Sequence, residues 1–114
     1  MYEIEYTAYF KNQLKRLMKK YPKSEDEFKS IIEKLEEGEL LGTPYDNLGL
    51  PPEEDVYKVM VANLDSNRSS KNGFRMIYYV IKDDIIYLLA VYAKSEMENL
   101  KQSEIKELIK KYCK

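Results

Sequence analysis

The amino-acid sequence predicts a single α+β domain in which an antiparallel β-sheet carries two amino-terminal helices on one face and is completed by a carboxy-terminal helix. Three observations predict this class: an alternating opening segment, two helical stripes before residue 38, and three runs rich in β-branched and aromatic residues after residue 55. A chain of 114 residues, of which 44% are hydrophobic, can bury one core and is too short for two ordinary domains. We therefore treat residues 1–114 as one domain.

The opening segment is expected to be a strand, because Tyr2, Ile4 and Tyr6 alternate with polar residues as in a half-buried strand. Apolar residues then recur at helical spacing over residues 10–21, with basic residues between them. This pattern predicts an amphipathic helix that ends at Pro22.

A second helix is expected after Ser24, which has the spacing of a capping box with Glu27. Its apolar stripe continues to Leu35 and ends before Gly38. Because the connection between the two helices is short, they are expected to pack as antiparallel neighbours. Residues 38–55 then hold three of the four prolines and three of the four glycines, which predicts an irregular connection.

Three strands are expected over residues 56–64, Phe74–Ile81 and Ile85–Ala93, and the turn at residues 82–84 joins the last two as an antiparallel hairpin. In the last strand both faces are apolar. Strict alternation places Ile85, Tyr87, Leu89 and Val91 on one face and Ile86, Leu88 and Ala90 on the other. The two amino-terminal helices can cover one face only, so the second face must pack on the terminal helix or on a partner protein.

The terminal helix is expected after Ser103, with a start at Ser95 and a capping box to Glu98 as the alternative. The predicted order of elements is therefore β-α-α-β-β-β-α.

The composition excludes several classes of site. The chain has no histidine, which removes Ser-His-Asp and Cys-His machinery and most catalytic zinc sites. Its one cysteine, Cys113, has no companion for a disulfide or a zinc site. No metal and no cofactor are therefore expected, and any chemistry must use Lys, Arg, Tyr or carboxylates.

Hydropathy and charge limit the location and the partners. The apolar runs are shorter than the roughly 20 residues of a membrane-spanning helix, and the amino terminus lacks a secretory pattern, so a cytoplasmic protein without membrane contact is expected. The net charge is −1, but it is unevenly distributed. Residues 1–55 hold eight basic and thirteen acidic residues, whereas residues 56–95 hold six basic and three acidic ones. The positive excess falls on the segment predicted to form the sheet.

Basic and aromatic residues gather near the expected strand ends. They are Lys58 in the first of the three strands, Arg68 and Lys71 in the polar loop at residues 66–73, Arg75 directly after that loop, and Tyr92 with Lys94 where the last strand ends. Such groups suit a site that binds a nucleic-acid phosphate with a base stacked beside it. The alternative interpretation is ordinary edge lysines and core tyrosines.

Three segments resemble the sheet of RelE/HigB toxins, within the RelE/ParE superfamily of toxin-antitoxin systems. They are Val56-Tyr57-Lys58-Val59-Met60-Val61, Gly73-Phe74-Arg75-Met76-Ile77-Tyr78-Tyr79-Val80, and the run from Ile86 to Glu96. The resemblance implies a metal-independent, ribosome-dependent endoribonuclease in which a ribose 2′-hydroxyl attacks the neighbouring phosphate of messenger RNA. It also implies neutralisation by a cognate antitoxin, expected to be a helical segment on the second sheet face or beside the terminal helix.

The resemblance assigns roles to individual residues. Arg75 aligns with the phosphate-clamping arginine, and Lys58 with a lysine that acts on the attacking hydroxyl or stabilises charge. Tyr92 and Lys94 would orient the substrate. Arg68, Lys71 and Tyr78 are the expected substrate-binding residues.

The chain also departs from the RelE pattern. Met60 and Ser95 stand where basic residues are expected, and the loop reads Ser70-Lys71-Asn72-Gly73 in place of Lys-Ser-Gly-Gly. Two alternatives of the same fold therefore stay open: a ParE-like inhibitor of DNA gyrase, and a catalytically inactive interaction module.

Overall fold

A computed structural model describes residues 2–97 and 99–113. Along the chain the elements are β1 (Glu3–Tyr6), α1 (Ala8–Lys20), the 3-10 turn η1 (Pro22–Ser24), α2 (Glu25–Glu36), β2 (Thr43–Pro44), β3 (Glu54–Val61), η2 (Ser70–Asn72), β4 (Phe74–Ile81), β5 (Ile85–Ala93) and α3 (Gln102–Tyr112). The α+β class and the predicted helices and main strands are confirmed. The two-residue strand β2 lies in the segment expected to be irregular.

The sheet is mixed, and the prediction of an antiparallel sheet is wrong for its first strand. The strand order is β1-β5-β4-β3-β2, and β1 runs parallel to β5 while the other pairs are antiparallel. The junction of β1 with α1 is fixed by Thr7. The Thr7 hydroxyl donates to the Leu88 carbonyl of β5 at 2.8 Å and accepts from the Phe10 amide at 3.2 Å, so one residue both caps α1 and anchors it on β5.

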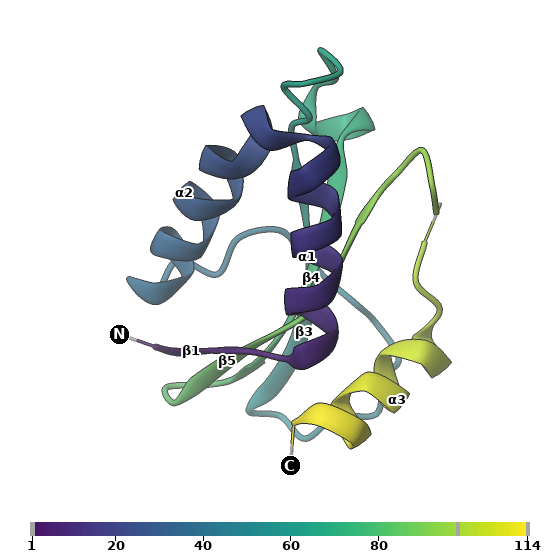
Figure 1. Cartoon of the computed structure of the whole chain (residues 1–114). Coiled ribbons are helices and arrows are strands. Elements are labelled where there is room, and N and C mark those ends of the chain that lie inside the picture. The colour runs from purple at the N-terminus through teal and green to yellow at the C-terminus, as the bar shows by residue number, and fades with distance from the viewer. Residues whose placement is uncertain (1, 98, 114) are drawn as a thin grey trace.

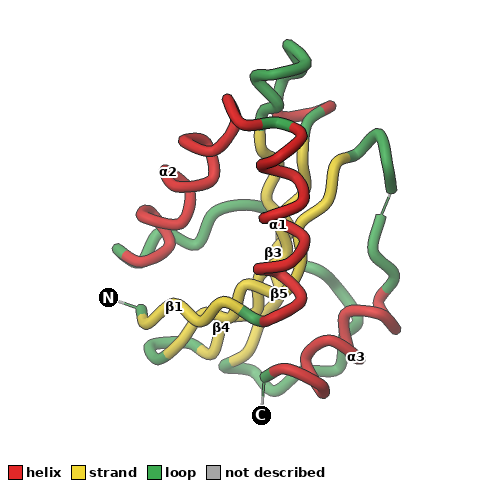
Figure 2. Tube along the Cα trace, in the orientation of Figure 1, coloured by secondary structure: helices red, strands yellow, loops and turns green. Residues whose placement is uncertain are grey.

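The sheet is covered on both faces (Figures 1 and 2). Helices α1 and α2 pack on one face through residues that include Phe10, Leu17, Phe28 and Leu35, as predicted. The two helices run in opposite senses from η1 but diverge (Figure 1). On the other face a second core contains Ile105, Ile109 and Cys113 of the carboxy-terminal region. Of the two covers expected for this face, the terminal helix is the one found.

A bulge in β5 changes which residues share a face. Arg75 pairs with Tyr92 and Ile77 with Ala90, but the next residue, Tyr78, pairs with Leu88, so Leu89 is the extra residue. The strict alternation expected for β5 is therefore wrong from Ala90 onward. Leu89 and Ala90 both belong to the second core, and Val91 joins Ile86 and Leu88 in the first.

The capping box predicted at the start of α2 is not formed, although Ser24 is at the N-cap position. The Ser24 hydroxyl donates to the Asp65 carboxylate at 2.8 Å and accepts from the Leu64 amide at 3.1 Å. The Asp65 carboxylate also accepts from the Lys23 amide at 2.9 Å. The Ser24 hydroxyl thus accepts from the Leu64 amide in place of the Glu27 amide, and its own proton is held by the charged Asp65 carboxylate. These contacts fasten the loop after β3 to the junction of the two helices.

Helix α3 begins at Gln102, close to the predicted start after Ser103. The Glu104 carboxylate accepts from the Lys101 amide at 3.0 Å, which satisfies one unpaired donor of the first turn. Ser95 lies in a turn and not in a helix, so the alternative start is wrong. Its box partner, Glu98, lies outside the described residues.

Candidate functional site

The register of the sheet brings three of the four predicted catalytic residues to one face. Met60 pairs with Arg75, Arg75 pairs with Tyr92, and Lys58 pairs with Ile77. Because alternate residues of a strand share a face, Lys58, Arg75 and Tyr92 lie on the face that also carries the second core. Lys94 follows directly after the end of β5, in the turn. Without the bulge at Leu89, Val91 would stand opposite Arg75 in place of Tyr92.

Lys58 is half-buried and is held from two sides. Its ammonium group donates to the Asn99 side-chain oxygen at 3.2 Å and lies 5.8 Å from the centre of the Tyr45 ring. Tyr45 is positioned by its backbone amide, which donates to the Val56 carbonyl at 2.8 Å. Gly42 lies against the backbone of Lys58, where a β-carbon would collide with the Lys58 carbonyl. These contacts fix the position of a cationic group at the surface of the sheet.

Arg75 is 7% exposed and is turned toward the loop that precedes it. Its guanidinium donates to the Lys71 carbonyl at 2.7 Å and to the Phe74 carbonyl at 3.2 Å. A buried guanidinium needs such acceptors, because an unpaired buried charge is costly. A phosphate that bound Arg75 would therefore compete with the loop carbonyls.

Tyr92 is 3% exposed, so it supports the site from within the core and does not present a ring for base stacking. Burial, together with the adjacent Tyr92 hydroxyl, raises the pKa of Tyr45 to about 12. Tyr45 is therefore neutral at physiological pH. Its ring packs against the second core and also lies beside the Lys58 ammonium group.

The loop before β4 supplies the remaining basic groups. The Lys94 amide donates to the Gly73 carbonyl at 2.9 Å, and its ammonium group approaches the Asn72 side-chain oxygen at 3.5 Å. Lys71 is exposed and shares the loop with them. Arg68 is exposed at the other end of the loop, where its backbone exchanges two hydrogen bonds with Asn63. The structure thus joins Lys71 and Lys94 to the Arg75 region and leaves Arg68 at the edge.

The substrate-binding role expected for Tyr78 is wrong. Tyr78 is fully buried in the first core, beneath α1 and α2, and stacks on Tyr57 at 5.2 Å between ring centres. Its hydroxyl donates to the Leu41 carbonyl at 2.7 Å. The residue is on the opposite face of β4 from Arg75, because the two positions differ by an odd number.

Several residues near the site were not predicted. Tyr45 and Asn99 come from irregular segments, where no periodic pattern marks a contact with Lys58. The basic residues of α1, on the other side of the sheet, were predicted as part of an amphipathic helix but not as a binding surface; the helix has five Lys or Arg residues and no acidic residue. Counting charge over residues 1–55 concealed this positive excess, because the acidic residues that follow α1 outweigh it. A window of one helix length would have found it.

No protein-family model matches the chain, and no curated protein sequence matches it. Over residues 2–97 and 99–113, no helix has the length and apolar character needed to cross a membrane. Within the same residues, no group of three Asp, Glu, Cys or His side chains is arranged to hold a metal ion.

Proposed function

We propose that the chain is the toxin of a toxin-antitoxin pair and acts in the cytoplasm as a ribosome-dependent endoribonuclease on messenger RNA. The observation that carries this proposal is the common face of Lys58, Arg75 and Tyr92, with Lys94 at its end. The resemblance of the same segments to RelE/HigB toxins supports it. Basic groups fixed on a rigid sheet are suited to stabilise charge that develops on a phosphate.

The proposed reaction is an attack by the ribose 2′-hydroxyl on the adjacent phosphorus. The 2′-oxygen forms a bond to phosphorus and loses its proton, while the bond to the 5′-oxygen breaks and that oxygen takes up a proton. The products are a 2′,3′-cyclic phosphate and a free 5′-hydroxyl. Lys58 would stabilise the negative charge on the phosphoryl oxygens, and Arg75 would do so after exchanging a loop carbonyl for the phosphate.

The burial of Arg75 and Tyr92 favours a second candidate, in which the same fold works by binding alone, as a DNA gyrase inhibitor or an inactive interaction module. Induction of the chain in bacteria, followed by mapping of transcript 5′ ends, separates the candidates. The ribonuclease should give discrete breaks within translated regions. Growth arrest with intact transcripts and trapped gyrase-DNA complexes would indicate the gyrase inhibitor. The absence of both transcript breaks and trapped complexes would indicate the interaction module.

The proposal includes a cognate antitoxin with an amphipathic helical segment. A groove between α1 and α3 has an apolar lining of Tyr9, Leu100, Leu108 and Tyr112 and a charged lining of Glu104, Glu107 and Lys111. It is suited to an amphipathic segment, and the sheet face itself is already covered by α3. Co-expression with the product of the adjacent gene tests this part. Failure of the two proteins to form a complex or to restore growth would contradict it.

Met60 offers a gain-of-function test. This side chain is 48% exposed and stands opposite Arg75, at a position where the RelE pattern has a basic residue. Met60→Lys should place a second ammonium group beside the site and raise the rate of RNA cleavage, up to about tenfold. The rate is measured on a defined transcript in a translation extract. Met60→Gln is the uncharged control, and equal rates for both variants would contradict the electrostatic role of this face.

A further inference from the structure

Helix α1 has a strongly basic surface. Its basic residues are Lys11, Lys15, Arg16, Lys19 and Lys20, and it contains no acidic residue. Arg16 and Lys20 are one helical turn apart and therefore lie on the same side of the helix. Together with Asn12, Lys15 and Lys19 they line a shallow depression on the surface.

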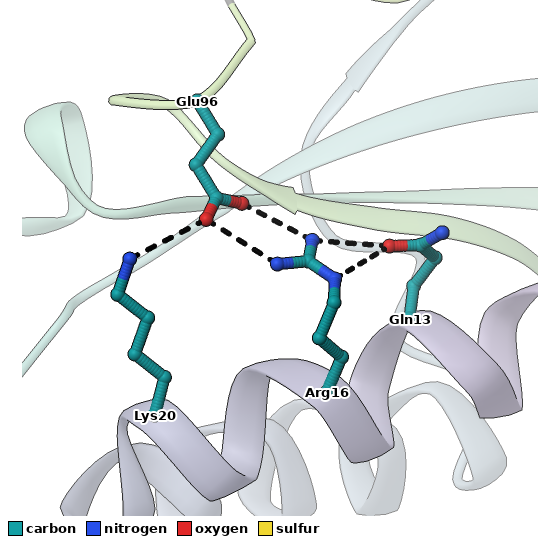
Figure 3. A network of polar contacts seen from close by, with 4 residues as sticks. All are labelled: Gln13, Arg16, Lys20 and Glu96. Carbon is teal, nitrogen blue, oxygen red and sulfur yellow. Dashed lines mark hydrogen bonds and ion pairs between the residues drawn. The ribbon is translucent and has the colours of Figure 1, made fainter.

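A single carboxylate from a distant part of the chain occupies Arg16 and Lys20 (Figure 3). The Arg16 guanidinium donates to the two oxygens of Glu96 at 3.1 and 3.3 Å, and the Lys20 ammonium lies 3.7 Å from one of them. Gln13 accepts from the other edge of the guanidinium at 3.1 and 3.3 Å and so fixes its orientation. The hydrogen bond from Arg16 holds the pKa of Glu96 below its ordinary value, so the carboxylate is ionised at neutral pH.

This network has the features of an anion site and contributes little as a structural brace. The side chains of Arg16 and Lys20 are 51% and 59% exposed, and exposed ion pairs add little to stability. A guanidinium fork binds phosphate oxygens with the same two-point geometry that it uses for a carboxylate. In the described part of the chain, Lys15 and Lys19 form no ion pair. Their ammonium groups can therefore contact further phosphates beside the site.

We propose that Arg16 and Lys20 bind a phosphodiester group of RNA, and that Glu96 is an internal competitor which the RNA must displace. The choice of RNA rests on the proposed function, whereas the anion site rests on the geometry. Glu96 lies two residues after Lys94, in the turn that follows β5. Displacement of Glu96 would therefore release the turn next to the candidate catalytic residues and couple RNA binding on α1 to that site.

The test is equilibrium binding of a fluorescein-labelled 2′-O-methyl RNA oligonucleotide to the full chain, measured by anisotropy over a range of salt concentrations. The probe has no free 2′-hydroxyl and cannot be cut by the proposed reaction. Glu96→Gln should lower the dissociation constant about fivefold. It should also steepen the dependence of log affinity on log salt by about one unit, because the probe then gains an unopposed phosphate contact. Arg16→Ala should weaken binding about tenfold.

The matched control is Glu33→Gln on α2, which changes the net charge equally and lies outside the network. Equal gains for Glu33→Gln and Glu96→Gln would overturn the proposal, since net charge alone would then explain them. Unchanged or weaker binding by Glu96→Gln would also overturn it, and a gain seen only with DNA of the same sequence would overturn the assignment to RNA. If no transcript breaks were found in cells but Glu96→Gln still strengthened RNA binding, the enzymatic proposal would be wrong and the proposed RNA site on α1 would stand.

Discussion

Replacing Lys58 with methionine is expected to lower RNA cleavage about a hundredfold and to relieve growth arrest on induction. The variant removes the ammonium group and keeps most of the aliphatic stem, so the packing beside Tyr45 is retained. Only the fixed charge and its bond to Asn99 are lost. The measurement is the frequency of transcript breaks per unit of induced protein, with the thermal midpoint of the purified variant as the check on folding.

Lys82→Met is the matched control for this experiment, because Lys82 is exposed in the β4–β5 turn and the substitution changes the net charge equally. It should leave cleavage unchanged. If Lys58→Met cleaved RNA as fast as the wild type, Lys58 would not belong to the catalytic site, and the gyrase inhibitor and the interaction module would remain as candidate functions. Arg75→Ala is a less specific probe, since the guanidinium also holds the Lys71 carbonyl and its loss would disturb the loop.

The second large effect is expected at Gly73, where alanine should destabilise the fold by about 3 kcal/mol. A β-carbon at this position would collide with the Val61 carbonyl oxygen and come within 2.8 Å of the Asn63 amide nitrogen. Both neighbours are backbone atoms, so a strand or the loop must move. The movement would also disturb the Gly73 carbonyl, which accepts from the Lys94 amide. Urea denaturation of the purified variant measures the loss.

Gly49→Ala separates this steric effect from backbone strain. Gly49 has a positive φ of 68°, but an added β-carbon would meet only open space, so its substitution should cost about 1 kcal/mol. If Gly73→Ala proved no more costly than Gly49→Ala, the close approach of the loop to β3 would not be required for the fold.

The sequence predicted the elements well, because periodicity reports which residues of one helix or strand face a core. It predicted the helices and the β4–β5 hairpin. It did not predict that β1 runs parallel to β5. Nor did it predict the partner of the Ser24 hydroxyl, because Asp65 is distant along the chain and a local rule considers only Glu27.

The burial of the site residues was the larger omission. Tyr78 was expected in the substrate site, although its odd separation from Arg75 along β4 puts the two on opposite faces. The exposure of Arg75 and Tyr92 depends on the loop and on the second core, which involve contacts between segments with no common pattern. Residue type and spacing therefore indicated which Lys and Arg residues lie near the strand ends. The tertiary contacts decide which of these side chains are exposed to solvent.

The extra residue in β5 has a consequence for how this protein can vary. Many apolar side chains could replace Leu89, because its position in the second core mainly requires an apolar side chain of similar volume. Deleting Leu89 would remove the bulge and leave Ala90, Val91 and Tyr92 on their present faces, because Leu88 already pairs with Tyr78 and Ala90 with Ile77. Keeping the residue while losing the bulge would instead turn every later residue of the strand to the opposite face and place Tyr92 under α1. The irregular pairing at Leu89, and not the number of residues in β5, therefore decides which face Tyr92 occupies.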